Sequence, residues 1–240
     1  MSSYELVTYN QPRSFISESF RTLRANLQFL GAGDTLKSIL MTGGMAGEGA
    51  SFITANLGII FAQTGQRVVI VDCDLRRPQQ HLIFNIDNQY GLTSILTGFK
   101  DTDGVIKSLP LNGIQLLTAG PLPTNPTELL GSQKMSQLVE ELKQKADVIL
   151  LDTPPLTVVA DAAVLSKVVD GVLQVVRSRV ASRNSVLKTK ELLTNAKARV
   201  LGAVLNCSGS DEIGEGYYSY HSPGSEKLKK KKTATKMESK

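Results

Sequence analysis

The chain has 240 residues, of which 41% are hydrophobic and 20% charged, as in an ordinary globular protein with one sizeable α/β domain. No apolar run approaches the roughly 18 residues that a membrane-spanning helix needs, and we expect a cytoplasmic protein. Residues 221–240 hold seven Lys and two Glu and account for all of the net charge of +5. The folded body is therefore close to neutral, and we predict no nucleic-acid partner.

The N-terminal region is expected to contain an extended arm followed by a helix. Residues 1–13 show no periodicity and include Pro12, which favours an arm. In residues 14–30, apolar side chains recur at spacings of three and four, which predicts an amphipathic helix. These apolar residues are Phe15, Phe20, Leu23, Leu27 and Leu30. A second face carries the charged residues Glu18, Arg21 and Arg24, a stripe that on its own is typical of a solvated helix face.

Beyond residue 36, strand and helix patterns alternate. Apolar runs predict strands at 37–43, 67–74, 113–120, 146–153, 170–176 and 198–206, and a helix at 50–65. Strands this uniformly apolar are expected to be buried on both faces, which predicts a doubly wound, mostly parallel α/β sheet flanked by helices. We assign residues 14–207 to this domain and residues 208–240, where the apolar pattern stops, to a disordered tail that carries tyrosines and lysines. Cys73 and Cys207 lie in or beside apolar runs and are expected to be reduced core thiols.

A glycine-rich segment, MTGGMAGEGAS, joins the first strand to the next helix. Gly44, Gly49 and Ser51 match the phosphate-binding pattern G-x-x-x-x-G-K-S/T, whereas Ala50 occupies the lysine position. Glycines in such a loop let backbone N–H groups approach phosphate oxygens at a helix N-terminus. A loop that merely connects strand and helix is an equal alternative on this segment alone.

Three aspartates follow apolar strands. Asp72 and Asp74 end VVIVDCD, where the strand period of two predicts that their side chains share a face, and Asp152 ends VILLD. Each could singly cap a helix or form a turn. Three at the carboxyl ends of neighbouring parallel strands favour a site for Mg²⁺ and phosphoryl transfer.

The segments GEGAS, VDCDLRRP and LLDTPP, together with a tyrosine-bearing tail, resemble the bacterial tyrosine kinases (BY-kinases) of exopolysaccharide and capsule synthesis. The resemblance extends from about Pro12 to Tyr220. It implies a P-loop fold of the MinD/ParA type and an autokinase that uses ATP and Mg²⁺ to phosphorylate tail tyrosines of neighbouring subunits.

The resemblance also implies roles for individual residues. Asp72 would be the general base, Ser51, Asp74 and Asp152 would serve Mg²⁺, and Glu18, Arg21 and Arg24 would make contacts between subunits of a ring. Tyr217, Tyr218 and Tyr220 would be phosphorylated. The ATP-binding residues would be Gly44, Met45, Ala46, Gly47, Glu48, Gly49, Ala50, Ser51, Phe52 and Asn206.

The implied partners are a separate transmembrane activator of the polysaccharide co-polymerase type, which would recruit the chain to the inner face of the membrane, and a cognate tyrosine phosphatase. Ala50 departs from the family, because a lysine here offsets phosphate charge during transfer. We therefore predict a strongly impaired kinase that arose by a single substitution, engineered or natural. Two alternatives remain, a MinD/ParA-like ATPase whose assembly is gated by ATP and a non-catalytic scaffold.

Overall fold

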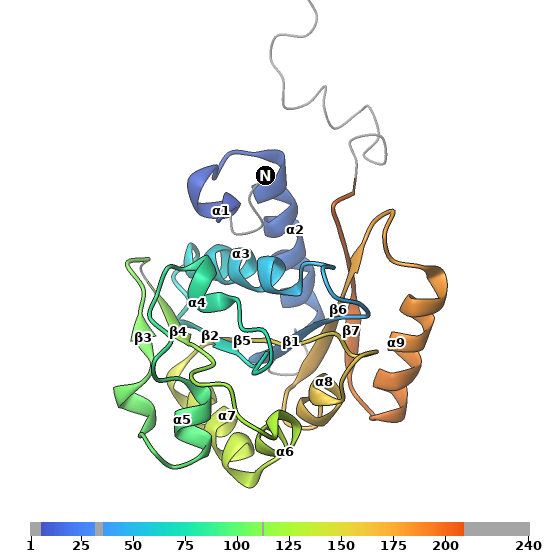
Figure 1. The fold of residues 1–240 in the computed structure, drawn as a ribbon. Helices are drawn as coiled ribbons and strands as arrows, with labels where there is room; N and C mark the ends of the chain where they lie inside the picture. Colours follow the sequence, from blue (N-terminus) through green and yellow to red (C-terminus); the bar gives the residue numbers. More distant parts are fainter. Residues whose placement is uncertain (1–5, 32–35, 112, 209–240) are drawn as a thin grey trace, which may run out of the picture. The chain divides into compact units, whose positions relative to one another are not determined.

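The computed structural model describes residues 6–31, 36–111 and 113–208, which form a seven-stranded sheet covered by helices on both faces (Figure 1). The strand order is β3-β4-β2-β5-β1-β6-β7, and every neighbouring pair is parallel except β3 with β4. The strands are β1 (Ser38–Gly43), β2 (Val68–Asp72), β3 (Lys107–Ser108), β4 (Ile114–Leu117), β5 (Val148–Asp152), β6 (Gly171–Arg177) and β7 (Val200–Asn206). The predicted doubly wound, mostly parallel sheet is confirmed.

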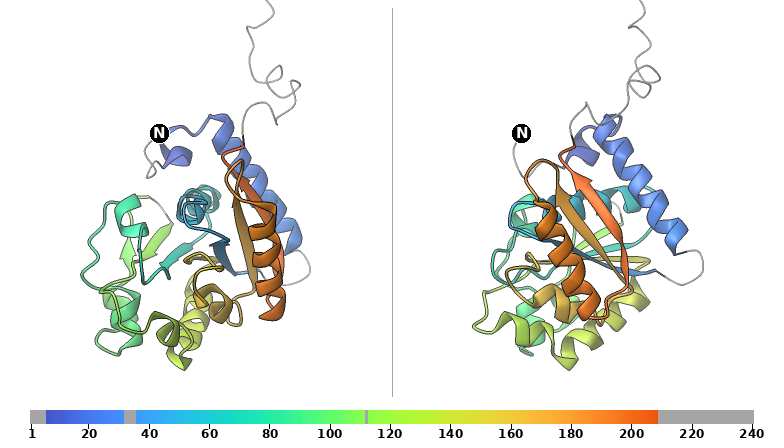
Figure 2. Two further views of the ribbon diagram at one scale, coloured as in Figure 1. Left: turned by 45° about the vertical axis from the view of Figure 1, so that its right-hand side comes forward. Right: turned by 90° about the vertical axis from the view of Figure 1, so that its right-hand side faces the viewer.

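Two groups of helices cover the sheet, and Figures 1 and 2 show α1, α2 and α3 on one face and α7, α8 and α9 on the other. The helices are α1 (Val7–Asn10), α2 (Phe15–Leu30), α3 (Ala50–Ala62), α4 (Gln80–Ile83), α5 (Leu92–Leu96), the 3₁₀ turn η1 (Thr102–Gly104), α6 (Pro126–Leu130), α7 (Gln133–Lys145), α8 (Asp161–Leu165) and α9 (Arg183–Asn195). No helix in the described ranges is long and apolar enough to cross a bilayer.

The predicted amphipathic helix is α2, and its apolar stripe packs on α3. Ser14 caps its first turn by accepting a hydrogen bond from the Ser17 N–H at 3.2 Å. Phe20 and Leu27 are buried, and the Phe20 ring lies 6.0 Å from that of Phe52 on α3. Helix α3 is apolar nearly all round because it lies between the sheet and α2. This packing fixes the orientation of the α3 N-terminus.

The described part of the predicted arm is not extended. Residues 7–10 form the helical turn α1, in which Val7 and Thr8 are buried. The Thr8 N–H and hydroxyl both donate to Asn56 Oδ1 on α3 at 2.9 Å. A tertiary contact, rather than local periodicity, therefore determines this segment.

Two further expectations are wrong at the edge of the sheet. Strand β7 is an edge strand and leaves much of its surface exposed, including Val200 and Leu205, although its sequence is as apolar as that of the buried strands. Cys207 is exposed, whereas Cys73 is fully buried as expected. Burial, followed by the charge of Asp72, raises the pKa of the Cys73 thiol well above its usual range, which keeps it protonated.

Candidate active site

The predicted phosphate-binding loop connects the end of β1 at Gly43 to the start of α3 at Ala50. Gly49 has φ +93°, and a Cβ atom there would lie 2.2 Å from Asn206 Nδ2, so only glycine fits. Gly49 provides no side-chain cap, and the first N–H groups of α3 are therefore available to an anion. The uncapped start of α3 is thus the part of the loop suited to hold a phosphate.

Four side chains hold this loop in place. The buried Glu48 carboxylate accepts the N–H groups of Gly44 at 2.5 Å and Met45 at 3.2 Å through Oε2. Loop carbonyl groups accept hydrogen bonds from the side chains of Thr157 (to Gly44), Arg177 (to Gly47) and Asn206 (to Glu48) at 2.5, 3.0 and 2.9 Å. Sequence analysis missed Thr157 and Arg177, because no motif contains them and only the fold brings them to the loop. Asn206, expected at the nucleotide, does lie against the loop.

Ala50 is the first residue of α3 and places a methyl group where the pattern has an ammonium group. Arg76 and Arg77, the two arginines of the segment VDCDLRRP, do not replace it. Arg76 is held by Asp161, with Nε 2.9 Å from Oδ2, and Arg77 is exposed. The Arg177 side chain does reach the loop, but it donates its hydrogen bond to the Gly47 carbonyl oxygen. The loop therefore has N–H donors and no lysine charge.

Asp72 and Asp152 end adjacent strands in register, and both are fully buried. Asp72 Oδ2 accepts the backbone N–H groups of Gln79 at 3.0 Å and Gln80 at 2.9 Å. Burial, followed by the charge of Asp152, raises the pKa of Asp72 well above its usual range. Burial likewise raises the pKa of Asp152 to about 7, against the opposing hydrogen bonds from Gln80 and Ser51. In the described chain, no Lys or Arg forms an ion pair with either carboxylate.

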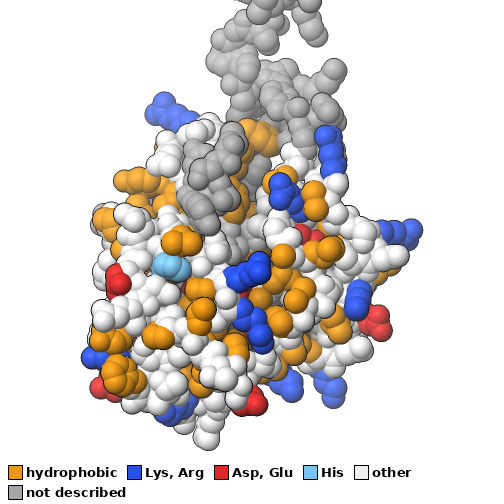
Figure 3. Space-filling view, in the orientation of Figure 1, with side chains coloured by type: hydrophobic (Ala, Val, Ile, Leu, Met, Phe, Trp, Pro, Cys, Tyr) orange, Lys and Arg blue, Asp and Glu red, His pale blue; other side chains and the backbone are white. Residues whose placement is uncertain are grey.

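These carboxylates are not part of the molecular surface. On the face shown in Figure 3, hydrophobic side chains lie among Lys and Arg, and most of the visible Asp and Glu lie toward the rim. The acidic charge of the site is thus inside the protein, where water screens it little.

Asp74 lies beyond the end of β2, and the strand period used to predict its direction does not reach it. Its Oδ1 accepts the N–H groups of Arg76 at 3.1 Å and Arg77 at 2.8 Å, which fixes the turn after β2. The Asp74 N–H donates to Asp72 Oδ1 at 3.2 Å, and its charge raises the pKa of both Asp72 and Asp152. Asp74 is therefore electrostatically part of the site.

Beside the buried aspartates, Asp152 Oδ1 and Gln80 Oε1 lack a hydrogen-bond partner among the described residues, as does Glu48 Oε1 on the loop. Ser51, whose hydroxyl interacts with Asp152, lies beside them. Such oxygens fit a Mg²⁺ ion, which keeps several waters and is bound by one or two carboxylates. The described residues contain no cluster of three or more His, Cys, Asp or Glu that could hold a metal, so an ion here depends on hydroxyl, amide and water oxygens as well.

The predicted oligomerisation residues lie on α2. Arg21 pairs with Glu18 of its own helix at 2.8 Å and donates to Pro12 O at 2.6 Å. Arg24 Nε is buried without a hydrogen-bond partner in the described chain. Tyr217, Tyr218 and Tyr220 lie outside the described residues.

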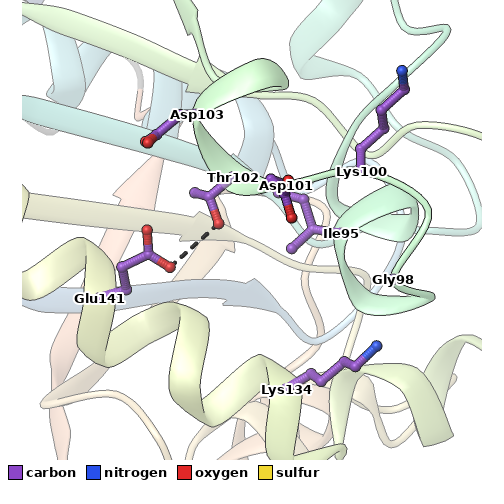
Figure 4. A pocket seen from close by; sticks show the side chains of 8 residues that line it. All are labelled: Ile95, Gly98, Lys100, Asp101, Thr102, Asp103, Lys134 and Glu141. Carbon is purple, nitrogen blue, oxygen red and sulfur yellow. Dashed lines mark hydrogen bonds between the residues drawn. The ribbon is translucent and has the colours of Figure 1, made fainter.

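A cavity of about 390 Å³ lies between the segment 95–103 and α7, away from the predicted residues (Figure 4). Thr102 donates to Glu141 across it at 3.2 Å, while Lys100 and Lys134 line other parts of its wall. None of its lining residues belongs to the loop or to the buried carboxylates. The chemistry of the site therefore does not involve this cavity.

Residues 35–239 match the ParA family described as "NUBPL iron-transfer P-loop NTPase". The tyrosine-protein kinase YwqD of Bacillus subtilis is 37% identical over 89% of this chain and 90% of its own length. The chain belongs to the bacterial tyrosine-protein kinases. Another member, the tyrosine-protein kinase Etk of Escherichia coli, is 32% identical over 82% of this chain, a match that spans 27% of Etk. The solved kinase domain of that protein superposes with a TM-score of 0.81, at 30% identity, over 86% of this chain and 82% of that domain.

Membership of this kinase family confirms the resemblance on which the sequence prediction rested. The septum site-determining protein MinD of Pyrococcus horikoshii shares the fold at 24% identity, with a TM-score of 0.63 over 72% of this chain and 71% of its own. The expected P-loop architecture of the MinD/ParA type is thus confirmed, and it implies nucleotide binding. In this fold the loop, Ser51 and the two buried aspartates lie at the same edge of the sheet.

Proposed function

We propose that this kinase domain transfers the γ-phosphoryl group of ATP, bound with Mg²⁺, to tyrosine hydroxyl groups. The observation that carries the proposal is the pair of buried carboxylates, Asp72 and Asp152, at the carboxyl ends of adjacent strands beside the phosphate-binding loop. Phosphoryl transfer needs a held triphosphate, a metal site and a proton acceptor within one enclosed volume. This edge of the sheet contains residues suited to each task.

Asp72 accepts the proton of the attacking tyrosine hydroxyl in this proposal. Its raised pKa makes the carboxylate a stronger base than an exposed aspartate. Backbone N–H groups of Asp74, Gln79 and Gln80 orient both of its oxygens. Because Asp72 is fully buried, the role requires the segment 73–80 to open as the tyrosine enters.

Ser51 and Asp152, with Asp74 nearby, would hold the metal. Mg²⁺ bound there would neutralise negative charge on the phosphates during transfer. The backbone of residues 44–49 and the N-terminus of α3 would hold the phosphates, and Asn206 would contact the nucleotide base from the end of β7.

Ala50 strongly impairs transfer in this proposal. Loss of one preorganised donor to a transition state commonly lowers the rate by about 10²–10³. A missing ammonium group beside a triphosphate should lower it at least as much, since Arg76 is paired with Asp161 and Arg177 donates to a loop carbonyl oxygen.

The wider role follows the kinases that this chain resembles. The substrates would be tail tyrosines of neighbouring subunits in a ring held together through Glu18, Arg21 and Arg24. A separate transmembrane activator would recruit the chain to the inner face of the membrane, and a tyrosine phosphatase would reverse the modification. Phosphates on crowded tails would repel and loosen the ring, which would regulate capsule or exopolysaccharide export.

Ala50 itself favours one alternative, a scaffold that binds nucleotide without transferring phosphate. Incubating the chain and its Ala50→Lys variant with Mg·ATP, followed by phosphotyrosine detection, separates the two. We expect a weak signal from the unaltered chain and one at least about 10²-fold larger from the variant, whereas a scaffold would give no signal as the unaltered chain. Silence in the variant, with and without the cytoplasmic segment of an activator, would exclude the kinase proposal.

A further inference from the structure

Gln80 is a fully buried polar residue that no motif predicts. It is the first residue of α4, and its side chain points into the site rather than to solvent. Nε2 donates to Asp152 Oδ2 at 2.8 Å and to the Ser51 carbonyl oxygen at 3.1 Å. Its backbone N–H donates to Asp72 Oδ2 at 2.9 Å. One residue thus joins both buried carboxylates to the first turn of α3.

The amide of Gln80 has one unused group. Both donors of Nε2 have acceptors, whereas Oε1 is buried and has no hydrogen-bond partner among the described residues. Asp152 Oδ1 is also buried and has no hydrogen-bond partner among the described residues. Buried acceptors without donors are unfavourable, and two in one site indicate that a further donor or cation belongs there.

We propose that Gln80 is a positioning residue of the divalent-cation site. Its Nε2 group fixes Asp152 through Oδ2 and leaves Oδ1 for the cation, and its Oε1 accepts a hydrogen bond from a water molecule on that cation. The inference rests on the proposed function, since it assumes that nucleotide binds together with a divalent cation. Packing alone does not account for an amide here, because methionine would fill nearly the same volume.

The comparison with Gln79 separates this role from a general effect on the fold. Gln79 is the preceding residue, has the same side chain and also donates its backbone N–H to Asp72 Oδ2. Its own Nε2 reaches only the Arg77 carbonyl oxygen, at 3.4 Å. The variants Gln80→Met and Gln79→Met therefore differ in whether the amide next to Asp152 is lost.

The experiment measures Mn²⁺ binding to the ADP-loaded protein by electron paramagnetic resonance, and ADP binding in EDTA by calorimetry. Gln80→Met should weaken Mn²⁺ binding about 10–100-fold, as loss of an outer partner of a metal ligand does, and leave ADP binding in EDTA unchanged. Gln79→Met should change neither. If Gln80→Met does not fold, Gln80→Asn keeps an amide that is one methylene too short, and the same loss is expected.

Equal Mn²⁺ affinity in Gln80→Met and the unaltered chain would overturn the inference and leave the metal-nucleotide proposal intact. An equal loss of ADP affinity in EDTA would also overturn it, because the residue would then support the whole loop. If neither the unaltered chain nor the Ala50→Lys variant binds Mn²⁺ when loaded with ADP, both the inference about Gln80 and the proposed use of a metal nucleotide are wrong.

Discussion

Replacing Asp152 with Asn should stabilise the protein above neutral pH, although it removes a residue of the site. The Asp152 carboxylate is fully buried next to Asp72, and no described cation pairs with it. Asparagine has nearly the same shape, and its Oδ1 can still accept the Gln80 amide. The substitution therefore removes a buried charge and leaves the packing in place.

Proton linkage determines whether the Asp152 carboxylate stabilises or destabilises the fold at a given pH. The pKa of Asp152 rises from an ordinary 3.8 in the unfolded chain to about 7 in the fold, so the native state binds the proton more tightly. The contribution of Asp152 to stability is therefore fully present below its pKa in the unfolded chain and is lost as the pH rises through its pKa in the fold. At 1.36 kcal/mol per pKa unit the shift corresponds to at most about 4 kcal/mol. We expect Asp152→Asn to recover about 1–3 kcal/mol near pH 8 and much less near pH 5.

Urea unfolding followed by circular dichroism, without nucleotide or metal, tests this at the two pH values. Asp161→Asn is the matched control, because Asp161 is also fully buried but forms an ion pair with Arg76 and accepts the Thr127 hydroxyl. It should destabilise the protein near pH 8 by about 1–3 kcal/mol, since Arg76 loses its partner. Destabilisation by Asp152→Asn of equal size at both pH values would refute the reasoning.

Three further results are expected. In the Ala50→Lys variant, the phosphorylation rate should rise with pH through the raised pKa of Asp72, because only the carboxylate form accepts a proton. Adding Asp72→Asn should abolish phosphorylation, and a pH–rate profile checks both results. Arg177→Ala should weaken ADP binding by about two- to fivefold in calorimetry by releasing Gly47, whereas the exposed Arg183→Ala should not. Leu27→Ala should lower stability by about 2–5 kcal/mol in the same unfolding assay, while Phe29→Ala, 79% exposed, should change it by less than about 0.5 kcal/mol.

Local patterns in the sequence were sufficient to predict most of the sheet. All six predicted apolar runs form strands, and the amphipathic period of α2 identified its buried face. The turn at residues 7–10 could not be predicted, because Asn56, far along the chain, supplies its hydrogen-bond partner. Strand β7 shows the opposite limit, since an apolar run does not reveal whether a strand lies at the centre or at the edge.

Sequence motifs predicted those site residues that lie at the end of a strand or in the glycine-rich loop. Ser51, Asp72 and Asp152 follow directly from strand ends and the glycine-rich loop. Gln80 and Arg177 could not be predicted, because their relevance comes from contacts with residues far away in the sequence. Strand alternation could not predict the direction of the Asp74 side chain, because β2 ends two residues before it.

The energetics of the site favour a chain that still binds a metal nucleotide. Asp152 and Glu48 are both buried, each with one oxygen unpartnered in the described chain, and Asp72 adds a second buried carboxylate beside Asp152. Neutral side chains of similar size would make a more stable protein, and a protein that binds no metal has no use for the charges. The buried aspartates become favourable when a cation enters the site, because a cation offsets their charge and Asp152 Oδ1 then has a partner. The buried carboxylates therefore favour a protein that still binds a metal nucleotide, with Ala50 limiting the transfer step rather than the binding.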